Sequence, residues 1–478
     1  RRGLEVARLA TNSVRMEQPN GSQEGARLLK GQQQTYSSSE LLCPEEGFVV
    51  GLGSELAREE KVKKRDALWY SIFLLGMGTL VGWNSLLAAV DFFRSSFKHS
   101  PSAAVWFTWV FELATLVTLS ALSTHGERFS FSFRFRAGFF IVAAVLVMIP
   151  TSIVMLSEHV AWSMTIVLVS ILAIGSGITE GSLYGFAAAV SSASGQHSGA
   201  NGEQETATFA TPAQAGQGFA GVLVCFIRIG SKAAFNTDTE GARQSGAVFF
   251  GVSALITMAC SFLGSRIAAG LPPVHVDDTL TWAEKTAVVK KVHKYALAQV
   301  FINVVTMAVF PAMATSPGQS TLGLSSGWLT VILVTLYSVA DTVGNLVGMP
   351  LMDRCFQRLP KGVMTMQSLT YWASMLRVVL VPLFMMQAAE RIKSDLAAMV
   401  LTVVLGLSNG ALSVVCMEKA PGTFVASAED REREHASYIM VVALLLGVTL
   451  GATLAIPLNL LVLPAGGWHG LLSQRVMQ

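Results

Sequence analysis

Charged residues are scarce in this sequence, and their scarcity limits its class. Only 14% of the 478 residues are charged, whereas 52% are hydrophobic. Soluble domains carry about a quarter charged residues, so the composition excludes an ordinary soluble protein and indicates one that crosses a membrane many times. The net charge of +3 is small, and we expect no nucleic-acid partner.

The motifs of several enzyme and metal-site classes are also missing. The five cysteines have no CxxC or other metal spacing, which favours small core residues or free thiols over a disulfide framework. The eight histidines form no HExxH pattern, and neither GxSxG nor a phosphate-binding loop occurs. We therefore expect no catalytic residue, no cofactor and no metal site.

One glycine-rich stretch, Gly216 to Gly221, superficially resembles a dinucleotide-binding fingerprint. That fingerprint follows a strand and opens a helix of an α/β fold. Here no strand precedes the stretch and the helix that it opens is hydrophobic, so we interpret its glycines as helix-packing residues.

Apolar stretches of about 20 residues recur along the chain, and each is long enough to cross a bilayer. A backbone in lipid must satisfy its own hydrogen bonds, so each stretch predicts a transmembrane helix. We place eleven, at residues 67–93, 103–123, 136–157, 162–190, 212–235, 246–269, 295–315, 326–351, 362–388, 396–417 and 436–463.

The polar segments predict the domain organisation. Residues 1–66 are rich in Ser, Gln, Gly and Glu, and we expect a mostly disordered cytoplasmic tail. The loop 270–294 carries a basic cluster; we interpret it as a cytoplasmic linker, with weak contact to anionic lipid as the alternative. It separates a six-helix bundle (67–269) from a five-helix bundle (295–463), and 464–478 form a short extracellular tail. This all-α, 6+5 split suggests a two-lobed transporter.

Lysine and arginine in the loops predict the orientation. With the N-terminus inside, eighteen of these residues fall in inner segments and six in outer ones. Cytoplasmic loops carry the excess of Lys and Arg, so the N-terminus is expected to be cytoplasmic and, after an odd number of spans, the C-terminus extracellular. We expect a monomer in the plasma membrane.

Six charged side chains fall well within the predicted spans, away from their ends, where such groups are costly and usually mark a substrate or ion path. Asp341 is the most isolated, because the run 327–351 contains no other acid and no Lys or Arg. An acid that only holds helices together is the alternative. The other five are Glu112, Glu180, Arg228, Lys232 and Arg377. Three acids and three bases suggest mutual neutralisation around a central cavity.

An aromatic and amide pair, Trp83-Asn84, follows the glycine-rich stretch 76–82. Glycines allow close helix contact or local bending. The pair could stack on a planar ring and hydrogen-bond its edge; an interfacial anchor is the alternative for Trp83.

Several segments resemble, in the expected order, signatures of the equilibrative nucleoside transporter family. They are Gly78-Thr-Leu-Val-Gly-Trp83-Asn84 for the first helix, Glu180-Gly-Ser-Leu-Tyr-Gly185 for the fourth, Gly216-Gln217-Gly218 continuing to Arg228 and Lys232 for the fifth, Ala340-Asp341-Thr-Val-Gly344 for the eighth, Arg377 with Val381-Pro382 for the ninth, and Ser408-Asn409-Gly410 for the tenth. Their order and the independent count of eleven spans carry the resemblance.

The resemblance implies a major-facilitator-like fold without its last helix. It also implies a central site for nucleosides or nucleobases, purines favoured, that opens alternately to each side. Trp83 would contact the base, and Glu180, Asp341 and Arg377 would line or brace the cavity. The residues expected to pack helices or line the cavity are Asn84, Gly177, Gln217, Arg228, Asn345 and Asn409.

The sequence departs from the family pattern at three positions. Gly82 replaces the usual proline, Glu180 stands where glutamine is usual, and Asn345 stands where an arginine is usual. The last two changes make the cavity more negative, and two nearby carboxylates do not both ionise readily. We therefore expect Glu180 or Asp341 to hold a proton for part of the cycle, which allows proton coupling or cationic substrates. The alternative is that Arg377 or Arg228 pairs with Asp341, which leaves facilitated diffusion.

Three rival functions stay open. A facilitator-type carrier of a sugar or organic cation is one, although the loop 125–135 lacks the Gly-Arg-Arg-type repeat of sugar carriers. A receptor would be favoured by seven spans and a ligand-binding amino domain, neither of which is present. A membrane enzyme would show activity without transmembrane flux.

Overall fold

The computed structural model describes residues 44–98, 100, 102–125, 129–195, 209–235, 239–269, 281–315, 320–360, 362–424 and 430–462. Residues 63–478 form one compact unit, and residues 1–62 form a separate one. Within the predicted disordered tail, 44–66 are helical, which corrects the prediction there; residues 1–43 and the predicted tail 464–478 lie outside the described residues.

Helices are the regular elements of the described residues. They are α2 (Pro44–Ala88), α3 (Val90–Ser96), α4 (Ala103–His125), α5 (Phe131–Met155), α6 (Glu158–Gly195), α7 (Ala210–Ala233), α8 (Thr239–Ala268), α9 (Trp282–Val309), α10 (Ser326–Arg358), α11 (Met366–Leu376), η2 (Arg377–Val379), α12 (Leu380–Ala388), α13 (Asp395–Lys419), η3 (Pro421–Thr423) and α14 (Asp430–Val462). Within the described ranges, eleven segments are long and apolar enough to cross a membrane, which confirms the predicted number of spans.

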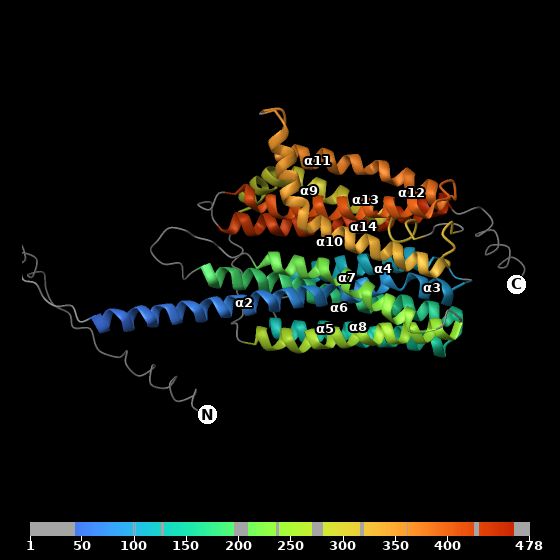
Figure 1. Ribbon diagram of the computed structural model, residues 1–478, viewed down its shortest axis with the longest axis horizontal. Coiled ribbons are helices and arrows are strands. Elements are labelled where there is room, and N and C mark those ends of the chain that lie inside the picture. The colour runs from blue at the N-terminus through green and yellow to red at the C-terminus, as the bar shows by residue number, and fades with distance from the viewer. Residues whose placement is uncertain are drawn as a thin grey trace, which may run out of the picture. The chain divides into compact units, whose positions relative to one another are not determined.

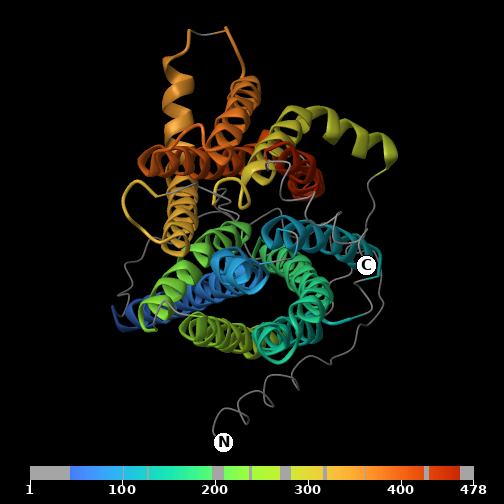
Figure 2. The ribbon, with the colours of Figure 1, turned by 90° about the vertical axis from the view of Figure 1, so that its right-hand side faces the viewer.

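The spans pack in two groups, which Figures 1 and 2 show as blue-to-green and yellow-to-red halves. In the first group α5 packs on α6 and α8, and α4 packs on α6; in the second α10 packs on α13 and α9 packs on α14. We call α2–α8 the N-lobe and α9–α14 the C-lobe. The lobes meet where α3 and α7 contact α10 and where α4 contacts α14. The predicted all-α, two-lobe arrangement is therefore confirmed.

The two ends of the bundle are named here by the helices that mark them. At the α3 end, on the right in Figure 1, α2 is followed by α3. At the opposite end, the α9 end, α8 finishes at Ala268 and α9 begins at Trp282. A substrate path between the lobes would run from one of these ends to the other.

Helix α9 begins well before the predicted start at residue 295. A capping box fixes its first turn: the Thr281 hydroxyl accepts from the Glu284 N–H at 3.4 Å, and Glu284 Oε2 accepts from the Thr281 N–H at 2.7 Å. This reciprocal pair satisfies two orphan donors of a helix start. Residues 282–294 of the predicted linker are therefore helical, and 270–280 lie outside the described residues.

The ninth span is interrupted where Arg377 lies. Helix α11 passes through the short turn η2 into α12, which contains Pro382. Proline has no N–H and its ring crowds the carbonyl four residues earlier, so the regular helix breaks in the preceding turn. This 3₁₀ turn begins at Arg377, in the middle of the span Met366–Ala388.

Helices α10 and α13 cross so closely that glycine is required at their contact. A Cβ atom on Gly410 would overlap the Asp341 carbonyl oxygen, and one on Gly344 would overlap the Leu407 carbonyl oxygen. Small residues allow this kind of backbone approach in membrane helices. This close crossing places Asp341 of α10 directly beside α13, the helix that carries Asn409.

We expect Gly410→Ala to destabilise the protein by about 1–3 kcal/mol or more, because its methyl group would meet backbone atoms that cannot move aside. The measurement is the thermal unfolding midpoint of the purified protein in detergent. Gly251→Ala in α8 is the matched control: a Cβ there meets nothing within 4 Å, and alanine favours a helix by roughly 0.5–1 kcal/mol over glycine. Equal unfolding midpoints for the two variants would contradict the close crossing.

Candidate functional site

Asp341 lies midway along α10, and its carboxylate is held by two amides. Asn409 Nδ2 donates to Oδ1 at 2.8 Å, and Asn345 Nδ2 donates to Oδ2 at 3.4 Å. Among the described residues, no Lys, Arg or His forms an ion pair with Asp341. The side chain is partly exposed, so a carboxylate in the middle of a span keeps acceptor positions for a ligand.

Arg377 is linked to Asp341 through two uncharged side chains rather than directly. Its Nη2 donates to Thr306 Oγ1 at 2.8 Å, and Thr306 lies 2.7 Å from Asn409 Oδ1. The guanidinium also donates to the Ile302 carbonyl at 2.7 Å and to Ser408 Oγ at 3.0 Å. Arg377 is buried, so these acceptors fix its position and orient the amide of Asn409 toward Asp341.

Arg228 and Lys232 bind Asp91 of α3, so Arg228 is not the counter-ion of Asp341. Arg228 Nη2 lies 2.9 Å from Asp91 Oδ2, and Lys232 Nζ binds the same oxygen. Arg228 is 1% exposed and Asp91 is 8% exposed. Arg228 and Lys232, which share one face of α7, therefore both bind the same acid. That acid, Asp91, was not among the predicted site residues.

A second acidic cluster lies in the N-lobe. Glu180 Oε1 accepts from Gln217 Nε2 at 3.3 Å, and the Tyr184 hydroxyl donates to Gln217 Oε1 at 2.7 Å. Glu112 lies on α4, which packs on α6, and it is buried. One turn before Glu180, Gly177 packs against α4, since a Cβ there would lie 3.0 Å from Thr118. The structure thus brings together two of the predicted polar side chains, Glu180 of α6 and Gln217 of α7.

Trp83 is stacked on another aromatic ring. Its centroid lies 4.6 Å from that of Phe111 with an interplanar angle of 24°, and Trp83 is buried. Its neighbour Asn84 donates to the Leu80 carbonyl of its own helix at 2.9 Å and faces Gly221 of α7. In this conformation Phe111 covers one face of the indole, and Asn84 lies at a contact between α2 and α7.

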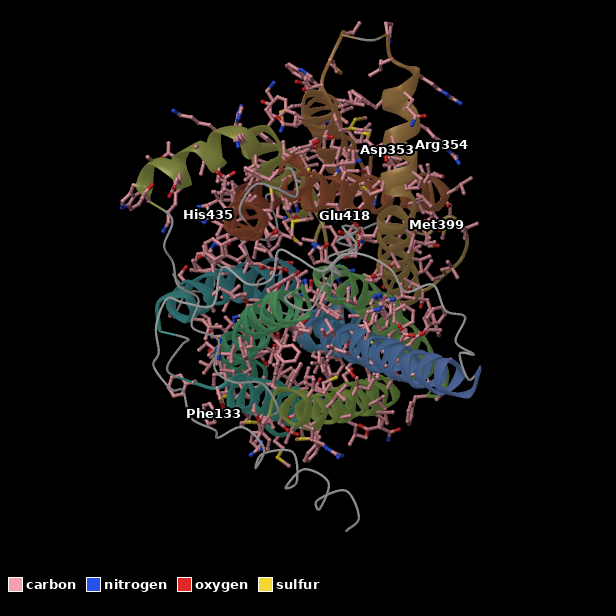
Figure 3. The ribbon with its side chains drawn as sticks, turned by 90° about the vertical axis from the view of Figure 1, so that its left-hand side faces the viewer. Phe133, Asp353, Arg354, Met399, Glu418 and His435 are labelled. Atoms are coloured by element: carbon pink, nitrogen blue, oxygen red, sulfur yellow. The ribbon has the colours of Figure 1, made fainter. Side chains whose placement is uncertain are left out.

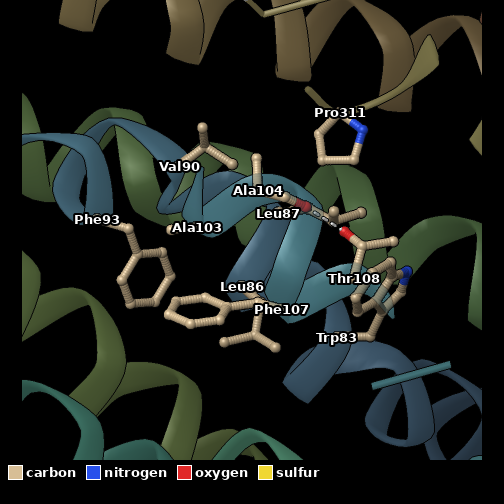
Figure 4. Close-up of a pocket in the computed structure, with 10 residues that line it drawn as sticks. All are labelled: Trp83, Leu86, Leu87, Val90, Phe93, Ala103, Ala104, Phe107, Thr108 and Pro311. Atoms are coloured by element: carbon tan, nitrogen blue, oxygen red, sulfur yellow. Dashed lines mark hydrogen bonds between the residues drawn. The ribbon is translucent and has the colours of Figure 1, made fainter. Parts of the chain in front are cut away.

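A small cleft lies beside Trp83 at the α3 end (Figure 4). Pro311 of the C-lobe faces N-lobe side chains across it. The lining residues are Trp83, Leu86, Leu87, Val90, Phe93, Ala103, Ala104, Phe107, Thr108 and Pro311. The lining is almost entirely apolar and includes neither Asp341 nor Glu180, so this cleft is separate from both acids.

Polar contacts join the lobes at the α3 end and near the middle. Arg94 Nη1 of α3 donates to the Thr315 carbonyl at 3.2 Å and to Thr330 Oγ1 at 3.3 Å. Lys232 Nζ lies 5.5 Å from the ring centroid of Trp328 on α10. Burial lowers the pKa of Arg94, and the charge of Asp91 opposes this shift. Near the middle, Thr342 Oγ1 donates to the Gly218 carbonyl at 3.0 Å.

The α9 end carries ion pairs that stay within the C-lobe. Figure 3 looks onto this end, where Asp353 and Glu418 lie on the C-lobe. Lys419 Nζ lies 3.0 Å from Asp353 Oδ1, and Lys291 Nζ lies 3.5 Å from Glu432 Oε2. These side chains are partly exposed, so the pairs add little stability and do not join the two lobes.

Two helical lobes of eleven membrane spans, with acids at mid-span beside the lobe contact, define a polytopic membrane carrier. Solved transporters share this fold. A bacterial homologue of the human lysosomal transporter Spinster, in an inward-facing and unoccupied conformation, aligns with a TM-score of 0.56 at 12% identity over 81% of each chain. A variant of the nucleoside transporter NupG aligns with a TM-score of 0.50 at 11% identity, over 81% of this chain and 89% of that one.

Sequence comparison gives the family. The family described as "Nucleoside transporter" matches residues 274–460. Equilibrative nucleotide transporter 8 of Arabidopsis thaliana is 30% identical over 421 residues, which cover 83% of this chain and 96% of that protein. Equilibrative nucleotide transporter 1 of the same plant is 25% identical over 413 residues, 80% of this chain and 84% of that protein. The chain belongs to the equilibrative nucleoside transporter family, as its signatures predicted.

Proposed function

We propose that this protein moves nucleosides or nucleobases, purines favoured, down their concentration gradient by alternating access. The observation that carries the proposal is the carboxylate of Asp341, held by two amides at mid-span where α10 meets α7. An ionised carboxylate accepts about four hydrogen bonds, and two of these positions are taken. The others suit a ligand with adjacent N–H or O–H donors, such as a base edge or a ribose diol.

The supporting residues have distinct roles in this proposal. Trp83 contacts the base, Glu180 lines the N-lobe wall of the cavity, and Arg377 braces Asp341 through Thr306 and Asn409. Because four of the five N–H groups of Arg377 already donate to fixed acceptors, its role is to orient the amide of Asn409 rather than to hold the substrate.

The contacts at the α3 end support a state that is closed on that side. We place the α3 end outside, from the excess of Lys and Arg in the inner loops; the N-terminus is then cytoplasmic and the C-terminus extracellular. The protein functions as a monomer in the plasma membrane. Transport requires the contacts of Arg94 and Lys232 with the C-lobe to break as the outer side opens.

A second candidate, proton-coupled carriage of nucleosides or of organic cations, is favoured by a specific observation. Asp341, Glu112 and Glu180 are three acids in the spans, and none of them forms an ion pair with a described cation. Acids inside a membrane usually pair with bases or mark proton paths.

The test is uptake of labelled adenosine into proteoliposomes that contain the purified protein. We expect saturable uptake that unlabelled purine nucleosides inhibit and glucose does not, with no accumulation when the pH is equal on both sides. With one proton per nucleoside, an inward gradient of one pH unit would instead give about tenfold accumulation, which would favour the second candidate. Uptake of glucose but not of adenosine would overturn both.

A further inference from the structure

We propose that the first turns of α9, residues 282–294, form a docking surface for anionic phospholipid headgroups. The surface belongs to the leaflet at the α9 end, which is the cytoplasmic one in the proposed orientation. The basic cluster of the predicted linker lies on these turns, and the proposed transport mechanism does not use it. The partner is a lipid such as phosphatidylserine, whose headgroup meets lysines while its chains meet an apolar stripe of the same helix.

Helix α9 is longer than a bilayer requires. Its 28 residues extend over about 42 Å at 1.5 Å per residue, whereas the hydrocarbon core is about 30 Å thick. About eight residues therefore lie outside the core, and the polar first turns are the part that suits this position. Figures 2 and 3 view the bundle from its two ends, and both show the first part of α9 (yellow) running sideways out of the C-lobe. A helix in this position lies along the membrane surface.

One face of these turns is fixed to the C-lobe. The residues of this face that belong to a buried apolar cluster are Val288, Val292 and Tyr295. Beside them, Lys291 Nζ lies 3.5 Å from Glu432 Oε2 of α14, and Lys294 Nζ donates to Ser368 Oγ of α11 at 3.0 Å. These contacts decide which face of α9 turns away from the protein.

The face that turns away carries an apolar stripe. Trp282 is 86% exposed, Val289 is 44% exposed and Leu297 is 46% exposed. Steps of seven and eight residues are close to two helical turns, so the three side chains lie on one side of α9. Tryptophan is enriched where the apolar core meets the headgroups, and Trp282 therefore marks that level at the start of the helix.

Two lysines flank the stripe. At 3.6 residues per turn, Lys285 and Lys290 lie on opposite sides of the line that joins Trp282 to Val289. Lys285 Nζ is 6.0 Å from the ring centroid of Trp282, and Lys290 is exposed. Lysine stems lie along apolar surface while their ammonium groups extend to the polar layer. An apolar stripe between two lysines thus matches both parts of a phospholipid.

The charge of these turns favours an anionic headgroup over a zwitterionic one. Residues 281–294 contain four lysines and one acid. The acid, Glu284, accepts two hydrogen bonds from Thr281 in the capping box, and Glu432 of α14 balances one lysine, Lys291. Positive charge remains in excess. Each lysine near an anionic membrane surface strengthens binding about fivefold.

The first experiment titrates the purified full chain in detergent with phosphatidylserine and, separately, with phosphatidylcholine of the same acyl chains. Native mass spectrometry counts the bound lipid. We expect phosphatidylserine to bind more tightly than phosphatidylcholine. Lys285→Gln/Lys290→Gln should weaken the binding of phosphatidylserine about 30-fold and leave that of phosphatidylcholine unchanged.

The matched control is Arg136→Gln/Arg266→Gln. Both arginines are exposed on the N-lobe, Arg136 near the start of α5 and Arg266 near the end of α8, so this variant removes the same charge and no part of the α9 surface. We expect it to bind phosphatidylserine as the wild type does. Equal weakening in both double variants would mean that net charge alone attracts the lipid, and unchanged binding in Lys285→Gln/Lys290→Gln would also overturn the docking surface. Glycerophosphoserine, the headgroup without chains, should not compete; full competition at equal concentration would indicate a small-anion site instead.

The second experiment locates the indole of Trp282 in phosphatidylserine vesicles whose acyl chains are brominated, because bromine quenches a tryptophan that contacts the chains. The fluorescence of the wild type minus that of Trp282→Phe reports this side chain, and we expect bromine to quench it. Trp372 of α11, which is 61% exposed within a span, is the positive control through Trp372→Phe. Quenching of Trp372 but not of Trp282 would place Trp282 in water and contradict the proposal. Neither readout measures transport, so a failure here leaves the proposed function untouched.

Discussion

Replacing Asp91 by asparagine is expected to lower the folding stability by about 3–5 kcal/mol. The variant would leave Arg228, which is 1% exposed, and its neighbour Lys232 without their shared counter-ion. A buried cation that loses its partner keeps its full desolvation penalty. The measurement is the fraction of monodisperse protein after extraction, together with the thermal unfolding midpoint in detergent.

The matched control is Asp353→Asn. Asp353 also pairs with a lysine, Lys419 at 3.0 Å, but both side chains are more than 30% exposed, and exposed pairs contribute about 0–1 kcal/mol. Neutralising the whole cluster in Asp91→Asn/Arg228→Met/Lys232→Met should recover part of the loss, since no buried charge is then left over. If Asp91→Asn unfolds at the wild-type temperature, the cluster does not hold α3 to α7.

Asp341→Ala is expected to reduce adenosine exchange by about 10- to 150-fold while the protein stays folded. The estimate follows from losing a hydrogen bond to a charged group, about 1.5–3 kcal/mol, in the substrate complex and at the transition state. The measurement is the initial rate of exchange in proteoliposomes, divided by the amount of monodisperse protein.

Val343→Ala is the control for that substitution. Val343 lies two residues further on α10, and its side chain is 42% exposed, so its truncation removes no contact of the site. We expect exchange near the wild-type rate. Asn409→Ala should fall between the two, because it removes the 2.8 Å hydrogen bond to Asp341 but keeps the acid. Near-normal exchange in folded Asp341→Ala would exclude a central role for the acid.

The sequence predicted the spans well because length and apolarity alone decide whether a segment can cross a membrane. It predicted their ends less well. Helix α9 starts at Trp282 rather than 295, and the signal was present as Thr281 and Glu284, the two members of a capping box. Hydropathy misses such a start because the first turns of α9 are polar.

The partners of the charged residues could not be predicted in the same way. A sequence shows that Arg228 and Lys232 share a helix face, but only the packing of α7 on its neighbours decides which acid they meet. Asn409 was expected to pack or line the cavity and turned out to contact Asp341 directly. The bridging residue Thr306 gave no signal, because a threonine in a helix usually bonds to its own backbone.

The contacts between the lobes at the α3 end have a kinetic consequence. The hydrogen bonds of Arg94 and the cation–π contact of Lys232 are each worth about 1 kcal/mol, so together they favour closure on that side by roughly 30- to 150-fold. A solute that arrives at the α3 end can bind only to the small fraction of carriers that are open on that side. Its apparent affinity at that end is therefore weaker by the same factor. A carrier that establishes no gradient of its own would thus saturate at a high solute concentration at the α3 end. At the α9 end it would saturate at a lower solute concentration.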